Sequence, residues 1–399
     1  MLCQKEDCTG CEACFNICKN NAIKMIEDEV GFFYPEINEE LCLNCNLCSK
    51  VCPILNKENL CEKKDVEVLA ASNNKKEILD KSASGGVFSA LAEYVILKNG
   101  VVYGAGFDKD FELNHMSAKS MEEIDPLRSS KYLQSRINYI YREVEGDLNN
   151  EKLVLFVGTP CQVSGLKSFL RKEYENLITV DLFCHGVPSE KLFKDHIKFL
   201  EEKYRGKITE FYFRNKKYGW KNFTTLKIKI GDKYKYLKSD FDSYMNFYTS
   251  LLSLRPSCYN CKFSKLPRNC DFSIADYWGI DENIVGKDLL NAGVSLVVLN
   301  SKKAKDIMVE LNGSFKLYKG NLEEAIKGNG TITDNINKKP KGFKENFKKD
   351  YAEQGYNYIR KRYFNIPLKV RIINTVGKNN IRRIVKFRNK LRNMIGIIK

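Results

Sequence analysis

The stretch CTGCEACFNIC at residues 8–18 decides the fold of the first module, because four of its eleven residues are cysteine. Its spacing, C-x2-C-x2-C-x3-C, returns 34 positions later in CLNCNLCSKVC at residues 42–52. The cysteines of the two copies are Cys8, Cys11, Cys14 and Cys18, followed by Cys42, Cys45, Cys48 and Cys52. A motif repeated at a fixed offset indicates an internal duplication, so both copies belong to one module.

Each copy can hold three irons of a cubane cluster, because the two C-x2-C steps turn the backbone around it, while the fourth cysteine reaches the other cluster. This pattern resembles a bacterial-type two-cluster ferredoxin. We expect two crossed sets of [4Fe–4S] ligands: Cys8, Cys11 and Cys14 with Cys52, and Cys42, Cys45 and Cys48 with Cys18. Lys19 stands where the second copy has Pro53, which removes no ligand. Residues 22–37 predict two short strands around a turn.

Zinc and disulfide bonds are the alternatives. Structural zinc sites usually take their ligands from separated pairs rather than from one run of four. Disulfides require an oxidising compartment, whereas Met1 is followed by Leu2, Cys3 and charged residues rather than by a secretory signal. We therefore expect iron–sulfur clusters in a cytoplasmic protein.

The length of 399 residues allows two or three domains. Hydrophobic residues make up 43% of the chain, and no apolar run reaches the length of a membrane span. The net charge of +16 is confined to residues 338–399, which contain 19 basic and three acidic residues. The sequence thus divides into an α+β ferredoxin-like module (1–56), a second domain (66–335) and a basic tail (338–399).

The second domain is expected to be α/β, because strand and helix patterns alternate along it. SASGGVFSALAEYVILKNG (82–100) predicts a helix, and a tight turn and helix are expected between residues 158 and 174. The predicted strands are VEVLAAS (66–72), VVYGAGF (101–107), LVLFV (153–157) and LITVDLF (177–183). This alternation favours a substantially parallel core.

Two further cysteines follow strands of that core. Cys161 follows 153–157 and Cys184 follows 177–183, and a right-handed crossover makes these two strands parallel. Both cysteines should then lie at the carboxyl edge of the sheet, where open α/β folds bind ligands. Cys258 and Cys261 lie in a loop that can fold over the same edge and complete a third cluster. Cys270 is a rival for one ligand position, and a C-x2-C zinc site is the alternative.

Two polar turns are candidates for contact with a cofactor. The Ser84-Gly85-Gly86 turn opens a helix, where free N–H groups can bind a phosphate, although such a turn is also an ordinary N-cap. SSKYLQS (129–135) offers hydroxyl groups and one cation, or is a plain polar loop. His185, next to Cys184, is a candidate for proton transfer, with a structural role as the alternative. No catalytic residue is assigned.

Five stretches, in this order, resemble the coenzyme F420 hydrogenase/dehydrogenase beta-subunit family: SASGGVFSAL, SSKYLQS, GTPCQVSGL, VDLFCHGVPS and CYNCKF…DFSIADYWGI. The resemblance covers roughly residues 1–300 and implies a domain that binds FAD and a [4Fe–4S] cluster. It implies Cys161, Cys184, Cys258 and Cys261 as ligands of the third cluster. It implies flavin contacts at Ser84, Gly85, Gly86, Ser130, Lys131 and Tyr132. Ala275 departs from the family's glycine at that place and leaves the role of Asp276 open.

The resemblance implies an oxidoreductase that moves electrons between [4Fe–4S] clusters, FAD and a soluble substrate or F420-like carrier. FAD exchanges electrons in pairs and each cluster carries one, so the combination links hydride chemistry to one-electron transfer. The alternatives are a non-catalytic electron-transfer subunit of a larger complex, or a reductase serving cell-surface polysaccharide synthesis. An electron donor or acceptor, either a protein or a carrier, is expected as partner.

The end of the tail, IRRIVKFRNKLRNMIGIIK (381–399), predicts an amphipathic basic helix. Its apolar positions are Ile381, Ile384, Val385, Leu391, Ile395 and Ile398. Such a helix can lie peripherally on the inner face of a membrane, since anionic lipid attracts its cations. A partner-docking helix is the alternative. Nucleic acid is not expected, because aromatic and base-reading features are missing.

Overall fold

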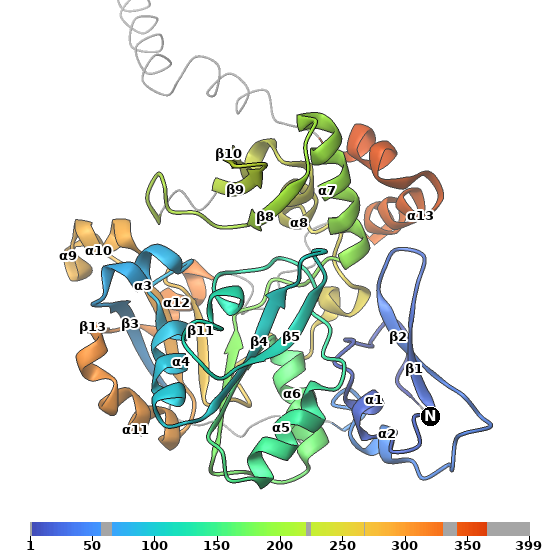
Figure 1. The fold of residues 1–399 in the computed structure, drawn as a ribbon, viewed down its shortest axis with the longest axis horizontal. Coiled ribbons are helices and arrows are strands. Elements are labelled where there is room, and N and C mark those ends of the chain that lie inside the picture. Colours follow the sequence, from blue (N-terminus) through green and yellow to red (C-terminus); the bar gives the residue numbers. More distant parts are fainter. Residues whose placement is uncertain (1, 57–65, 221–224, 267, 330–340, 365–399) are drawn as a thin grey trace, which may run out of the picture.

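The chain folds into a small N-terminal module, a domain built on a large sheet, and a second layer built on a small sheet (Figure 1). The computed structural model describes residues 2–56, 66–220, 225–266, 268–329 and 341–364. Among the helices of these residues, none is both long and apolar enough to cross a membrane.

The N-terminal module contains the predicted hairpin, in which β1 (Ile23–Glu27) pairs antiparallel with β2 (Phe33–Ile37). Two short helices, α1 (Ala13–Ile17) and α2 (Leu47–Lys50), follow equivalent residues of the repeat. These residues, Glu12 and Asn46, have φ angles of 61° and 58°. The same left-handed turn at the same place in both copies supports the internal duplication.

The large sheet has eight strands in the order β13-β3-β12-β11-β7-β6-β4-β5. Their bounds are β3 (Glu67–Asn73), β4 (Val101–Phe107), β5 (Leu113–Ala118), β6 (Val154–Gly158), β7 (Leu177–Leu182), β11 (Phe272–Asp276), β12 (Ser295–Leu299) and β13 (Phe315–Lys319). Four neighbouring strands, β11, β7, β6 and β4, are parallel, which agrees with the predicted parallel core, although β11 itself is not among the predicted strands. The outer strands pair antiparallel on both sides, which the sequence pattern does not predict.

Helices cover both faces of this sheet, and alternate residues of a strand enter different cores. Val102 packs with the α4 and α11 side, whereas Val101 and Tyr103 pack with the α5 and α6 side. The helices of the domain are α3 (Lys76–Lys81), α4 (Val87–Leu97), α5 (Ile140–Asn149), α6 (Pro160–Leu170), α9 (Glu282–Val285), α10 (Lys287–Ala292), α11 (Lys302–Glu310) and α12 (Leu322–Gly328). Short 3-10 turns are η2 (Asp125–Leu127), η4 (Ser239–Phe241), η5 (Pro256–Asn260) and η6 (Asn312–Ser314).

The N-terminal module is docked against the α5 and α6 side of the sheet (Figure 1). Ala13 and Ile17 of α1 share one buried core with Val163 and Leu166 of α6. The module and the domain are therefore joined by apolar packing.

The second layer is an antiparallel sheet of β8 (Ile208–Tyr212), β9 (Thr225–Ile230) and β10 (Lys233–Lys238). Its helices are α7 (Glu190–Tyr204), α8 (Ser243–Thr249) and α13 (Lys341–Tyr363), which lie together at the top of Figure 1. Aromatic side chains dominate its core, including Phe193, Phe211, Tyr244 and Phe347.

Part of the basic tail belongs to this folded layer. Tyr356 of α13 is buried, and its hydroxyl group lies 2.7 Å from Nδ1 of His196 on α7. Gly355, with φ 76°, kinks the helix. The amphipathic helix predicted at residues 381–399 lies outside the described residues.

Candidate functional site

The cysteines of the N-terminal module lie in two surroundings. Cys8, Cys11 and Cys52 are buried, Cys14, Cys18, Cys42 and Cys48 are partly buried, and Cys45 is exposed. Burial raises the pKa of the Cys14 thiol well above its ordinary value, and Cys11, Cys8 and Cys52 raise it further. Cys52 of the second copy therefore lies with three cysteines of the first, as the crossed arrangement requires.

The loop that carries Cys42, Cys45 and Cys48 lies nearer the surface. Leu43, between Cys42 and Cys45, has 75% of its surface exposed, and Leu41 has 48%. Exposed apolar side chains beside an exposed cysteine loop are features of a contact surface. Hereafter the buried site means Cys8, Cys11, Cys14 and Cys52, and the exposed site means Cys18, Cys42, Cys45 and Cys48.

Cys3 is a further thiol at the buried site that the sequence pattern does not assign. It hydrogen-bonds with the thiols of Cys52 and Cys8, and these bonds, together with burial, raise the pKa of Cys3. Cys3 is outside the repeated spacing, so no pattern points to it.

Cys161, Cys184, Cys258 and Cys261 line one small cavity together with Gln134, Thr159 and Gly186. The parallel pairing of β6 and β7 brings Cys161 and Cys184 to the carboxyl edge of the sheet, as predicted. The loop around η5 supplies Cys258 and Cys261. We call this group the domain site.

The four cysteines of the domain site are partly buried, with Arg255 near Cys161 and Cys258 and Arg268 near Cys261. Burial raises the pKa of Cys161 to about 11 and that of Cys258 to about 12, and each is raised further by Cys261. Burial likewise raises the pKa of Cys184 well above its ordinary value. All four are free thiols.

The donor set fits an iron–sulfur cluster. A cluster would hold these groups as thiolates, which are costly to bury without a cation. The Gly186 amide lies 3.4 Å from Sγ of Cys184, and the Thr159 hydroxyl group lies 3.2 Å from Sγ of Cys161. Such hydrogen bonds to sulfur are a means of adjusting a cluster's reduction potential. Among the described residues, no three or more potential ligands converge on a single-ion position.

Cys270, the rival ligand, does not line this cavity. Its thiol lies 3.2 Å from the Phe272 carbonyl oxygen and 3.3 Å from the Ser273 hydroxyl group, and it accepts a hydrogen bond from Asn300 at 3.4 Å. It belongs to a separate buried polar cluster.

The Ser84-Gly85-Gly86 turn packs closely against the sheet. The Gly85 amide donates to the Ser295 hydroxyl group at 2.9 Å, and a Cβ at Gly85 would lie 2.1 Å from the Ala71 carbonyl oxygen. Gly86 has a φ of 82°. The turn therefore needs its glycines for packing and backbone geometry, and the Gly85 N–H already has an acceptor.

Lys131 holds its own loop together. Its ammonium group donates to the carbonyl oxygens of Ala105, Pro126 and Arg128 at 2.6–2.9 Å. Burial lowers the pKa of Lys131 to about 7. The neighbouring Ser130 is partly buried. The ammonium group of Lys131 thus has three backbone acceptors, and its contact with a cofactor stays a prediction.

Tyr132, in contrast, lies at a junction of three of the family-like stretches. Arg214 donates to the Tyr132 hydroxyl group at 3.3 Å, to the Ala83 carbonyl oxygen at 3.4 Å and to the Asp276 carboxylate at 2.7 Å. Trp220 donates to the same carboxylate at 2.8 Å. Asp276, whose role the sequence left open, is thus the centre of this group. The sequence pattern misses Arg214, because it lies in FYFRNKKYGW (211–220), which has no motif.

An aromatic pair connects this junction with the domain site. The rings of Tyr132 and Tyr248 stack with their centroids 4.9 Å apart. Tyr248 is buried, which raises the pKa of its hydroxyl group, and Cys184 and Cys258 are close enough to raise it further. Burial lowers the pKa of His185, which Asp276 opposes. The cysteines of the domain site and the residues of the Tyr132–Arg214–Asp276 junction therefore lie in one continuous region.

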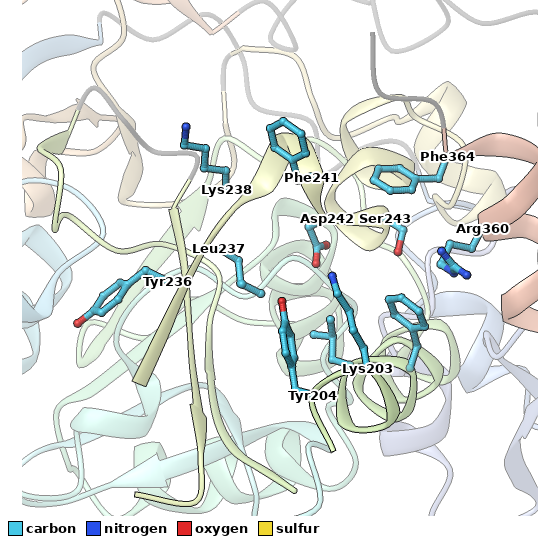
Figure 2. Close-up of a pocket in the computed structure, with 12 residues that line it drawn as sticks. Lys203, Tyr204, Tyr236, Leu237, Lys238, Phe241, Asp242, Ser243, Arg360 and Phe364 are labelled. Atoms are coloured by element: carbon cyan, nitrogen blue, oxygen red, sulfur yellow. The ribbon is translucent and has the colours of Figure 1, made fainter. Parts of the chain in front are cut away.

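A larger cavity of about 400 Å³ lies in the second layer, away from the cysteines (Figure 2). It is lined by the end of α7, by β10 and by α13, with Lys203, Asp242 and Arg360 among its side chains. Phe364, the last described residue, forms part of its wall.

Comparison with known proteins identifies both parts of the chain. Residues 7–55 match the model of the 4Fe-4S dicluster domain, and residues 151–324 match that of the C terminus of the beta subunit of coenzyme F420 hydrogenase/dehydrogenase. One subunit of the F(420)H(2) dehydrogenase of Methanosarcina mazei is 21% identical over 210 residues, which are 49% of this chain and 59% of the relative. The chain thus spans little more than half of that relative.

Two other similarities are narrower. An uncharacterized polyferredoxin-like protein of Methanocaldococcus jannaschii is 40% identical over 58 residues, which are 12% of this chain and 34% of the relative. A chain of the xenon-derivatised F420-reducing [NiFe] hydrogenase complex from Methanosarcina barkeri aligns with a TM-score of 0.48 and 17% identity, covering 74% of this chain and 94% of that chain. Residues 7–55 are thus a 4Fe-4S dicluster domain, and residues 151–324 match the C-terminal domain of the coenzyme F420 hydrogenase/dehydrogenase beta subunit.

Proposed function

We propose that the chain is an iron–sulfur flavoprotein oxidoreductase. In this proposal the exposed site, the buried site and the domain site each hold one [4Fe–4S] cluster, and FAD binds at the junction of Tyr132, Arg214 and Asp276. When bound, FAD supplies the exchange between paired electrons from a hydride and single electrons for the clusters. The partner is a soluble substrate or a carrier of the F420 type. Residues 1–56, 66–335 and 338–399 are proposed as its three parts.

The succession of the three cysteine groups carries this proposal. Gly165 lies one helical turn after Cys161 on α6, and a Cβ there would lie 3.1 Å from Sγ of Cys11. The buried site therefore approaches the domain site directly. Beyond the domain site, the stacked Tyr248 and Tyr132 lead to Arg214. Cysteine sites that follow one another from the surface to the flavin junction suit a protein that passes electrons inward from its surface.

At the proposed flavin site the residues of this chain would bind FAD and fix its orientation. Arg214 is a buried cation held by Asp276, and both lie beside the Ser84-Gly85-Gly86 turn. Tyr132 offers an aromatic face, and His185 is a candidate to hold a proton near Asp276. Ser84, Gly85, Gly86, Ser130, Lys131 and Tyr132 stay proposed as the lining of the site, with Lys131 acting through the loop that it fastens.

A non-catalytic electron-transfer subunit is the second candidate. The exposure of Leu41 and Leu43 around the exposed site favours it, because a partner protein could cover them. Service in cell-surface polysaccharide synthesis, with the basic tail on the membrane, stays a third hypothesis.

Anaerobic purification of the full chain tests these alternatives. Iron, sulfide and flavin are quantified in the same sample. The proposal expects about twelve irons and one FAD per chain, from three four-iron clusters. Twelve irons without flavin would favour the electron-transfer subunit. Zinc in place of iron would contradict both.

A further inference from the structure

Arg255 lies where the N-terminal module meets the domain. It stands three residues before Cys258 of the domain site, yet its side chain reaches Cys8 of the buried site. Nε donates to the Cys8 carbonyl oxygen at 2.7 Å, and Nη2 lies 3.8 Å from the Cys8 thiol. Nη2 also donates to the Phe33 carbonyl oxygen, and Nη1 donates to Gln134, both at 2.9 Å. One side chain thus joins the two sites.

The positive charge of Arg255 is buried without a carboxylate. The residue is 1% exposed, and its hydrogen-bond partners among the described residues are carbonyl groups, an amide and a thiol. The Tyr34 ring lies 4.3 Å from the guanidinium carbon. Burying a cation without an anionic partner is costly, because the charge loses its hydration. An anion beside Cys8 would offset this cost, and a cluster held by four thiolates is such an anion.

The repeat in the module provides an internal comparison. Cys42 occupies the position in the second copy that Cys8 occupies in the first. Its thiol is partly buried and lies 3.8 Å from Asn44 Oδ1, with no such cation among its described contacts. Two sites that arise from one repeated motif therefore differ in charge.

We propose that Arg255 is a positioning residue that raises the reduction potential of the cluster at the buried site above that of the cluster at the exposed site. The inference rests on the proposed function. Reduction adds a negative charge to a cluster, and a neighbouring cation with a hydrogen bond toward sulfur stabilises that charge. Burial of the site opposes the effect, so the cation is needed. An electron that arrives at the surface is thereby drawn toward the domain.

The test is a redox titration of the full chain, followed by electron paramagnetic resonance. Cys45→Ser and Cys11→Ser assign the two module signals by the signal that each changes. Arg255→Gln then removes the charge, and we expect about a tenfold loss in the one-electron reduction equilibrium of the buried site, equivalent to about 59 mV. Arg255→Lys keeps the charge and should recover part of the shift. The signal of the exposed site should not move.

Lys191→Gln is the matched control. Lys191 is a cation on α7 that donates to the Glu29 carbonyl oxygen of the module at 2.7 Å. It should leave both potentials unchanged.

The outcomes separate the two claims. An unchanged potential in Arg255→Gln, or an equal change in Lys191→Gln, would overturn the role of Arg255. Loss of the buried-site iron in both Arg255 variants would make it merely structural and also overturn the inference. A wild-type protein without the two module signals would refute the proposed function itself.

Discussion

Cys11 packs against Gly165 of α6 so closely that a Cβ added to Gly165 would lie 2.9 Å from Cβ of Cys11. The same Cβ would lie 2.9 Å from the Tyr141 hydroxyl group. Because residues four apart share a helix face, this contact brings the buried site next to Cys161. The absence of a side chain at one position of α6 therefore determines how near the module comes to the domain.

Gly165→Ala should weaken the docking of the module. Overpacking of a tight core costs about 1–3 kcal/mol, so we expect a lower midpoint in thermal unfolding. Gly146→Ala on α5 is the control, because a Cβ there meets nothing within 4 Å, and it should be neutral or stabilising by up to about 1 kcal/mol. Equal unfolding midpoints in the two variants would show that the close contact between Cys11 and Gly165 does not limit the docking of the module.

The double variant Cys258→Ser and Cys261→Ser should lose about four irons per chain, since it removes two thiolates from the domain site. Cys270→Ser should keep its iron, because Cys270 lies in a separate polar cluster. Iron analysis after anaerobic purification measures both. If only the Cys270 variant lost iron, Cys270 would be a ligand of the third cluster, and Cys258 and Cys261 would not.

Cys18→Ala should disturb the cluster of the exposed site, although Cys18 belongs in sequence to the other motif. The crossed arrangement requires this, since the fourth cysteine of each run serves the other cluster. Paramagnetic resonance of the reduced protein reports which signal changes. A change confined to the signal of the buried site would show that the ligands are not crossed.

Asp276→Asn should lower the flavin content of the purified protein. The variant leaves Arg214 as a buried cation without its carboxylate, which disturbs the junction with Tyr132. Glu310→Gln, which breaks an exposed pair with Lys98, is the control. Circular dichroism verifies that both variants are folded. Full flavin occupancy in folded Asp276→Asn would show that FAD does not bind at this junction.

His115 should make the protein less stable in mild acid. Burial lowers the pKa of this histidine to about 4, below the ordinary value of about 6.5. The unfolded chain therefore binds more protons between these values, and stability falls as the pH falls through this window. From pH 7.5 to 5.5 we expect a loss of about 1 kcal/mol from His115. Urea unfolding of His115→Gln should show a weaker pH dependence by that amount, and an unchanged dependence would contradict the assignment.

The parts of the molecule that follow a local pattern could be predicted from the sequence. The cysteine repeat predicted the module, and the apolar runs at 101–107 and 177–183 predicted β4 and β7 within a residue. The parallel crossover then placed Cys161 and Cys184 at one edge. Contacts between distant segments could not be predicted in this way. Arg214 bonds to Asp276 and Arg255 bonds to Cys8, and both partners are more than 60 residues away in the sequence. No local sequence pattern predicts contacts between such distant residues.

The central claim is that the buried site of the module and the domain site hold neighbouring clusters, and magnetic coupling tests it most directly. Reduced wild-type protein and the Cys258→Ser, Cys261→Ser variant are compared by paramagnetic resonance at equal occupancy of the module. The account predicts that removing the domain-site cluster changes the line shape and relaxation of the buried-site signal and leaves the exposed-site signal less affected. Identical module spectra in the two proteins would contradict it.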